Sequence, residues 1–342
     1  MYKILRYFLS FLSAERALRI ILACISFMGR FRFMHPFTRF IYKKTDPSLE
    51  RTVFGIKFSN PVGMAAGIDN NGKYSRQFSD MGFAFLEIGS VTPLAQKGNP
   101  MPRLFMLPKD KAVISRMGFN NDGIKAVIEN LKKTHPTAVI AANISKNSVS
   151  EGDKIVKDYS YCFSMLYDFV DMFVVNISCS FTDGKQPDLS YLSEIIDEML
   201  ETRMTLDQYK PVLLKISPDI GHSQVDEILN YALLSGIDGI VAGGSTLGRE
   251  GLDAKADKLD KIGEGRMSGA PLFKKNLDLV KYIHTQTKGR LPIIGCGGIM
   301  TPQDAAQMLE AGASLVEICS GFLYNGPSLV KKINKYLISH NA

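Results

Sequence analysis

The sequence predicts a closed barrel of eight parallel strands, surrounded by helices and preceded by a helical extension. Eight apolar segments recur between residues 62 and 319, and helical patterns separate them. Most of these segments end in Gly, Asn, Ser or Lys. Strands that alternate with helices form parallel sheets, and eight such units close into a (β/α)8 TIM barrel rather than an open sheet. Nearly continuous apolar strands fit a sheet that is buried on both faces.

The expected elements follow the chain in a regular order. Strands are predicted at 62–66, 84–89, 138–143, 172–177, 211–216, 238–242, 291–296 and 314–319. Helices are predicted at 123–133, 189–202, 223–234, 274–287 and 301–311, and a short hairpin at 52–58. The connections 90–137 and 243–273 are longer than a barrel needs. We expect them to cover the C-terminal rim, where barrels of this kind carry their active sites.

Length and composition fit a large globular protein. The 342 residues are 45% hydrophobic and 22% charged, which is ordinary for a chain with a large core. The five cysteines are scattered without CxxC or Cys/His spacing. We therefore expect neither a disulfide framework nor a metal site, and we expect a reducing compartment.

Residues 1–45 form a basic, apolar extension. They carry nine Lys or Arg and one acid, so the positive net charge of +7 is concentrated there. Apolar spacing predicts one helix over 2–12 and a second after Ser13, a candidate N-cap. Neither run reaches the ~20 residues that span a bilayer, and Arg16 and Arg19 interrupt a signal-peptide pattern.

Two interpretations of this extension remain open. Its helices either pack on the protein's own core, or they form an arm that lies peripherally on the cytoplasmic side of the inner (cell) membrane and opens to a lipid-soluble partner. Charge confined to one apolar arm favours an anionic membrane surface over nucleic acid, for which the sequence carries no motif.

Polar side chains end several predicted strands, at the rim where barrel chemistry takes place. Cys179 follows the 172–177 strand, and it is either an inert small apolar residue or a catalytic thiol whose pKa a neighbouring cation lowers. Lys215 ends the next strand and needs a partner, either an electron-rich cofactor ring or a surface salt bridge. Asn143 and Asn176 either hydrogen-bond a planar heterocycle or form turns.

Glycines end the last two predicted strands, at 295–298 and at Gly321. They form either tight turns or a phosphate site, because glycines let backbone N–H groups approach an anion. Thr301-Pro302 predicts a helix start directly after the first of these loops, whose dipole would favour the anion. No Walker A or GxGxxG motif follows the first strand, so a mononucleotide is the expected cofactor.

Six collinear motifs extend these signals over nearly the whole chain. They are NPVGMAAG (60–67), EIGSVTP (87–93), PRLF (102–105), RMGFNN (116–121), LPIIGCGGI (291–299) and GASLV (312–316). Together with the extension, they resemble the dihydroorotate dehydrogenases, and specifically the membrane-associated, quinone-dependent class 2. The resemblance implies FMN-dependent oxidation of dihydroorotate to orotate in pyrimidine biosynthesis, with a membrane quinone as electron acceptor. It also implies a membrane and quinone arm at 1–45 and an FMN-binding barrel at 46–342.

The resemblance assigns roles to individual residues. Cys179 falls at the catalytic base, which removes the C5 proton of dihydroorotate while hydride leaves C6 for the flavin. Arg103 falls at an arginine that faces the quinone tunnel. The flavin positions are Ala65, Ala66, Gly67, Ser90, Asn143, Asn176, Lys215, Gly269, Gly298, Cys319 and Ser320. The substrate positions are Ser115, Arg116, Met117, Gly118, Phe119, Asn176 and Ser245.

Several substrate positions depart from the family pattern. Asn70 stands where the family has a Lys that contacts orotate, while Phe181, Gly244 and Ser115 each stand where it has an Asn. Losing one hydrogen bond to a charged ligand costs ~1.5–3 kcal/mol. Arg266 and Arg249, in the connection 243–273, are candidates to replace the missing Lys.

Three functions therefore remain open from the sequence. The first is a quinone-dependent dihydroorotate dehydrogenase with an altered pocket. The second is a flavin oxidoreductase derived from that family that acts on another small substrate, because the flavin positions are retained beside changed substrate positions. The third is a non-catalytic barrel that binds flavin or a partner.

Overall fold

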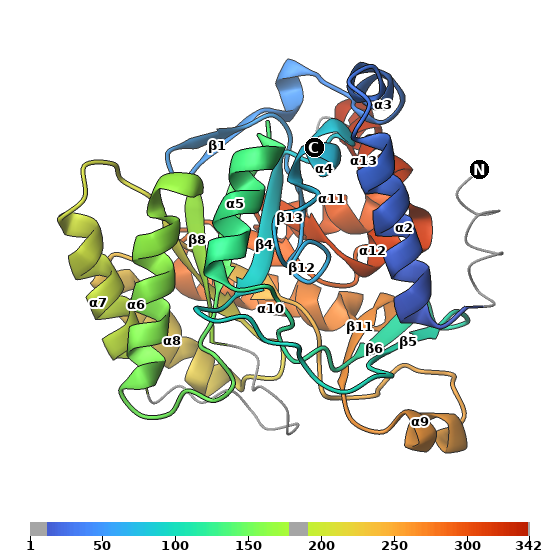
Figure 1. Cartoon of the computed structure of the whole chain (residues 1–342). Helices are drawn as coiled ribbons and strands as arrows, with labels where there is room; N and C mark the ends of the chain where they lie inside the picture. Colours follow the sequence, from blue (N-terminus) through green and yellow to red (C-terminus); the bar gives the residue numbers. More distant parts are fainter. Residues whose placement is uncertain (1–11, 178–190, 341–342) are drawn as a thin grey trace.

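A computed structural model has the expected closed barrel (Figure 1), and it describes residues 12–177 and 191–340. The parallel strands pair in the order β10-β12-β13-β3-β4-β7-β8-β9, and β9 pairs with β10 to close the barrel. Their bounds are β3 Val62–Met64, β4 Phe85–Val91, β7 Val139–Ile144, β8 Met172–Asn176, β9 Val212–Ile216, β10 Gly239–Gly243, β12 Ile293–Cys296 and β13 Leu315–Ile318. The predicted barrel is confirmed, and each predicted strand is present.

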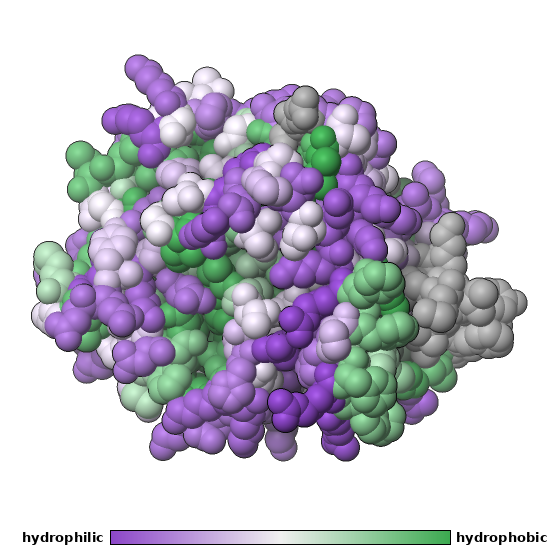
Figure 2. All heavy atoms as spheres, turned by 90° about the horizontal axis from the view of Figure 1, so that it is seen from above, coloured by the Kyte–Doolittle hydropathy of each residue, from purple (hydrophilic) through white to green (hydrophobic). Residues whose placement is uncertain are grey.

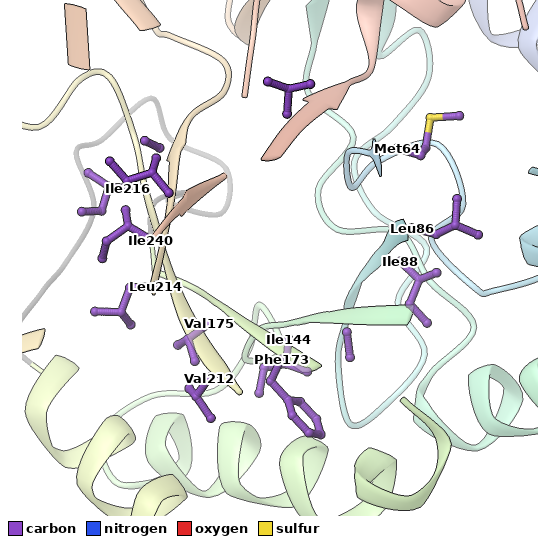
Figure 3. Close-up of a cluster of buried hydrophobic side chains, with 14 of the residues drawn as sticks. Met64, Leu86, Ile88, Ile144, Phe173, Val175, Val212, Leu214, Ile216 and Ile240 are labelled. Atoms are coloured by element: carbon purple, nitrogen blue, oxygen red, sulfur yellow. The ribbon is translucent and has the colours of Figure 1, made fainter. Parts of the chain in front are cut away.

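The strand pleat divides the core into an inner and an outer cluster, because successive side chains of a strand point to opposite faces. Leu86, Val175 and Leu214 point outward and pack with the surrounding helices (Figure 3). Phe85 and Leu213 point inward and fill the barrel. The hairpin β1 (Arg51–Val53) and β2 (Ile56–Phe58) contributes to the inner cluster, so its apolar side chains close the barrel interior.

Helices cover the outside of the barrel (Figure 1). They are α4 Ser75–Asp80, α5 Ile124–Thr134, α6 Lys154–Leu166, α7 Leu192–Met204, α8 His222–Ser235, α10 Phe273–Thr287, α11 Pro302–Glu310, α12 Ser320–Asn325 and α13 Ser328–His340. Three short 3₁₀ turns lie at Pro47–Leu49, Tyr167–Phe169 and Ala270–Leu272. The five predicted helices correspond to α5, α7, α8, α10 and α11.

The two long connections hold structure that the sequence did not predict. The first contains β5 (Leu104–Leu107) and β6 (Ala112–Ser115), and the second contains α9 (Ala256–Ile262) and β11 (Arg266–Gly269). These strands form a separate antiparallel sheet in the order β11-β6-β5. Local patterning missed the sheet because β11 pairs with a strand about 150 residues earlier in the chain.

The N-terminal arm consists of α2 (Ala14–Met28) and α3 (Met34–Tyr42), of which α3 was not predicted. In the arm, α2 packs on β5, and α3 packs on α4 and α13. Ser13 occupies the predicted N-cap position, but its side chain makes no capping hydrogen bond. The helix predicted over 2–12 lies outside the described residues. Within the described ranges, no helix combines the length and apolarity needed to cross a bilayer.

Candidate active site

A cavity of about 300 Å³ opens at the C-terminal ends of the barrel strands. Its floor includes Lys215 and Cys296, its walls include the loop 115–119, and it reaches Leu18 of α2. The volume lies at the lower end of the roughly 300–1,000 Å³ of ligand sites. The arm and the barrel therefore share one cavity.

The structure brings most predicted flavin positions to this cavity. It is lined by Ala65, Ala66, Gly67, Ser90, Asn176, Lys215, Gly298, Cys319 and Ser320. Asn143 and Gly269 do not line it. Asn143 is fully buried and acts through its neighbours, while a Cβ at Gly269 would lie 2.3 Å from the carbonyl oxygen of Lys111.

A continuous polar network joins the inward-pointing residues of neighbouring strands. Asn176 Nδ2 donates to Ser90 Oγ at 3.0 Å and to Asn143 Oδ1 at 3.2 Å. Asn143 Nδ2 donates in turn to Glu87 Oε1 at 2.5 Å. Because these amides are held by one another, they present fixed donors and acceptors to a ligand.

Lys215 lies between two carboxyl groups inside the barrel. Its Nζ is 2.5 Å from Glu87 Oε2 and 3.7 Å from Glu317 Oε2. Burial alone would raise the pKa of Glu87, but the charge of Lys215 and hydrogen bonds with Lys215, Glu317 and Asn143 together outweigh burial, so the pKa of Glu87 is lowered. Burial and the Glu87 charge raise the pKa of Glu317 well above its ordinary value. The predicted alternative of a surface salt bridge is wrong, because this lysine is paired in the barrel interior.

Glu87 and Glu317 are site residues that sequence reasoning did not assign. Each lies at 1% exposure in an otherwise apolar strand. A charge in such a strand requires a partner, and strand alternation places residues 87, 215 and 317 on the inner face. The sequence alone shows a charged residue inside each apolar strand. Which of these charged residues pair with one another depends on which strands are neighbours in the barrel.

Glycines leave room for a flat ligand above this network. A Cβ added at Gly67 or Gly244 would have no atom within 4 Å, although both residues line the cavity. Asn70 also lines the cavity, and its buried Oδ1 accepts no hydrogen bond from the described part of the chain. Open glycine faces and an unused acceptor fit a planar heterocycle with N–H groups.

The last two strand ends contribute Gly297 and Gly298, and Ser320 at the start of α12, to the cavity. The helix start predicted at Thr301-Pro302 is confirmed. A capping box between Thr301 and Asp304 occupies donors at this N-terminus, so these donors are not available to an anion in the cavity.

All the predicted substrate positions line the cavity. The Arg116 guanidinium nevertheless donates hydrogen bonds within the protein. It donates to the carbonyl oxygens of Ile262 and Glu264 at 2.6 Å each, and to that of Pro102 at 3.2 Å. Its guanidinium also lies over the Phe105 ring. Arg116 therefore fixes the loop 115–119 against the small sheet.

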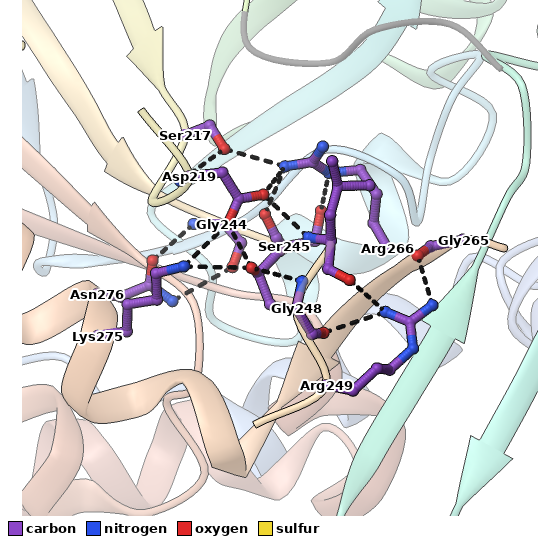
Figure 4. A network of polar contacts seen from close by, with 12 residues as sticks. Ser217, Asp219, Gly244, Ser245, Gly248, Arg249, Gly265, Arg266, Lys275 and Asn276 are labelled. Carbon is purple, nitrogen blue, oxygen red and sulfur yellow. Dashed lines mark hydrogen bonds and ion pairs between the residues drawn. The ribbon is translucent and has the colours of Figure 1, made fainter. Parts of the chain in front are cut away.

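Of the two arginines expected to replace the missing Lys, only Arg266 lines the cavity. Figure 4 shows its guanidinium among Ser217, Asp219 and Ser245. Arg249 instead donates to backbone carbonyl oxygens, among them those of Leu247 and Gly265. Arg266 is therefore the remaining candidate to replace the Lys that the family has at position 70.

Two further predicted residues are Cys179 and Arg103. Cys179 lies outside the described residues, so its role stays a prediction. Arg103 is not among the residues that line the cavity. Its Nε lies 3.0 Å from Glu15 Oε1, and its Nη1 donates to carbonyl oxygens including that of Lys97. This arginine ties α2 to the segment before β5.

Comparisons with known proteins agree with this geometry. A family model described as dihydroorotate dehydrogenase matches residues 48–340. The chain is 40% identical to a dihydroorotate dehydrogenase (quinone) of Christiangramia forsetii over 299 residues, which cover 87% of this chain and 86% of that protein. A protein of the same description from Coxiella burnetii is 38% identical over 344 residues, which cover 98% of this chain and 96% of that protein. A crystal structure of Eimeria tenella DHODH with ferulenol matches with a TM-score of 0.80 at 28% identity, covering 91% of each chain.

Proposed function

The chain belongs to the dihydroorotate dehydrogenase family and to its quinone-dependent class, and from that premise we propose that it oxidises dihydroorotate to orotate and passes the electrons to a quinone. The main support for this proposal is the cavity at the strand ends. Most of the flavin positions and all of the substrate positions line it, beside one polar network. The reaction would serve pyrimidine biosynthesis.

FMN is the proposed cofactor. When bound, it accepts the hydride that leaves the substrate. The open faces of Gly67 and Gly244 give its ring system room, and the glycines at 297 and 298 give its phosphate access to backbone donors. Lys215 is held charged by its two carboxyl neighbours and favours an electron-rich ring beside it.

The substrate is proposed to lie between the loop 115–119 and the ends of β8 and β10. The side-chain amide of Asn176 lines the cavity there, and Ser245 offers a hydroxyl. Cys179 is the proposed base that takes the C5 proton, since it stands three residues after Asn176, the last residue of β8. The alternative, a different small substrate, draws its support from Asn70 and Gly244.

The N-terminal arm at 1–45 is proposed as a separate functional unit that brings quinone to the barrel at 46–342. Leu18, Leu104 and Leu323 give the cavity an apolar side that reaches α2. The arm also exposes Phe33 and Phe40 at 69% and 82%. Apolar side chains among basic residues suit a peripheral position on the cytoplasmic face of the membrane.

The decisive experiment is anaerobic reduction of the FMN-loaded protein. Dihydroorotate should bleach the flavin absorbance band, and a quinone should restore it. Cys179→Ala should retain the flavin but bleach at least about 100-fold more slowly, because general-base catalysis contributes about 10²–10⁴-fold.

A yellow protein that does not bleach with dihydroorotate, yet bleaches with dithionite, would reject the substrate and favour the alternative. A protein that cannot be loaded with FMN would reject the cofactor.

A further inference from the structure

We propose that Arg266, together with the hydroxyls of Ser217 and Ser245, binds the carboxylate of the substrate. The proposal rests on the proposed function and names the group that supplies the positive charge absent at Asn70. In the pairing of β11 with β6, Arg266 lies directly opposite Ser115, at the start of the loop 115–119. Its side chain lines the cavity at 13% exposure.

The hydrogen bonds of Arg266 leave donors facing the cavity unused. Its Nε donates to Ser245 Oγ at 3.1 Å, and its Nη2 donates to Ser217 Oγ and to Asp219 Oδ2 at 2.9 Å each. Its Nη1 has no hydrogen-bond partner among the described residues. A guanidinium carries five N–H donors, so the two on Nη1 are available to a ligand.

The two serines point to the same kind of ligand. Each hydroxyl oxygen already accepts a hydrogen bond from Arg266, and neither donates to a residue that the structure describes. Because a hydroxyl has one O–H to donate, each keeps that donor free. Three neighbouring groups with unused donors match a ligand that only accepts, and a carboxylate is such a ligand.

The charge balance around Arg266 also favours an anion. Asp219 pairs with Arg266 and with Lys275, at 2.9 Å in both cases. Two cations thus share one carboxylate. The pKa of Asp219 is lowered, because hydrogen bonds from Thr246, the Leu247 N–H and Lys275 outweigh its burial. The cluster keeps one unbalanced positive charge at the cavity wall.

The other cations that line the cavity are already occupied. Lys215 pairs with two carboxyl groups, and Arg116 donates to three backbone carbonyl oxygens. Arg116 thus uses both N–H groups of its Nη1. Among the arginines of the described cavity wall, Arg266 is the one that keeps both N–H groups of a single nitrogen, Nη1, without a partner in the described part of the chain.

The test is calorimetric titration of the FMN-loaded protein with orotate and with uracil, which has the same ring without the carboxylate. Arg266→Gln, which keeps a polar but shorter and uncharged side chain, should weaken orotate binding about 10- to 100-fold and leave uracil binding unchanged. Arg249→Ala is the matched control from the same connection and should bind both ligands as the wild type does.

The other outcomes separate a failure of the carboxylate proposal from a failure of the proposed function. If Arg266→Gln loses orotate and uracil equally, the residue only supports the loop, and carboxylate binding is rejected. If it binds orotate as tightly as the wild type, the proposal fails while the proposed function stands. If the wild type binds no orotate, both fail. Wild-type binding without flavin bleaching by dihydroorotate would reject the proposed function alone.

Discussion

At the scale of single residues, the barrel interior holds more carboxyl groups than its lysine neutralises. Glu87 and Glu317 flank one cation, Lys215, and the nearer carboxyl group is that of Glu87. Two buried carboxylates beside one lysine cannot both ionise without cost. Burial and the neighbouring Glu87 charge therefore raise the pKa of Glu317 well above its ordinary value, whereas the pKa of Glu87, the nearer partner of Lys215, is lowered.

Glu317→Gln should change how stability depends on pH. Because the folded-state pKa of Glu317 lies well above its ordinary value of 4.5, the folded protein binds this proton more tightly than the unfolded chain. Its contribution to stability is full below the ordinary value and is lost as the pH rises toward the folded-state pKa. Glutamine does not ionise, so the variant does not lose stability in this way as the pH rises. The free energy of unfolding of the variant should therefore increase relative to that of the wild type as the pH rises above 4.5 toward the folded-state pKa of Glu317.

Urea unfolding of FMN-saturated protein at several pH values measures this difference. Glu310→Gln, an exposed acid on α11, is the control and should follow the wild type. Parallel pH curves for Glu317→Gln and the wild type would show that Glu317 is ionised in the folded state.

At the scale of elements, the attachment of α2 depends on one partly buried ion pair. Glu15 and Arg103 meet at 3.0 Å with side chains 10% and 13% exposed. The same glutamate lies 4.0 Å from Arg19, whose side chain is 64% exposed. Because water screens exposed pairs, the contact with Arg103 should dominate.

Glu15→Gln should therefore loosen α2 while the barrel stays folded. Losing a buried charged hydrogen bond costs about 1.5–3 kcal/mol, so amide exchange across Ala14–Met28 should accelerate about tenfold or more. Arg19→Ala removes only the exposed contact and should change exchange much less. Hydrogen-exchange mass spectrometry compares the two, and equal exchange in both variants would remove the special role of Arg103.

At the scale of the whole molecule, hydrophobic surface gathers on the arm. Figure 2 shows apolar surface beside charged residues on the side where Figure 1 places α2 and α3. Phe33, Phe37 and Phe40 are 69%, 54% and 82% exposed. Such a surface on an otherwise ordinary globular protein marks an interaction site.

The arm should bind anionic vesicles more tightly than neutral ones, and binding should weaken with salt, because the basic residues act through screened attraction. Replacing the three phenylalanines with Ser should reduce vesicle binding at least about tenfold, since burying each ring contributes about 1.5–3 kcal/mol. Leu234→Ser, at 88% exposure on α8, is the matched control. Co-sedimentation with equal binding of all variants would reject a membrane role for the arm.

Local patterns in the sequence were enough to predict the barrel and its family. Alternation of apolar strands and amphipathic helices is a local property, so the eight strands were found close to their true bounds. The strand-end positions, such as Asn176 and Lys215, followed from the same pattern. The motifs then identified the family without knowledge of any contact.

Which of these groups contact one another depends on the tertiary structure. The pairing of Lys215 with Glu87 and Glu317 depends on the closure of the barrel, and the position of Arg266 depends on the pairing of β11 with β6. Neither Arg249 nor Arg266 is favoured by its place in the sequence. In the fold, Arg266 lines the cavity, whereas Arg249 donates to backbone carbonyl oxygens. The contacts of Arg266 with Ser217 and Asp219 join residues far apart in the chain, which local patterns do not predict.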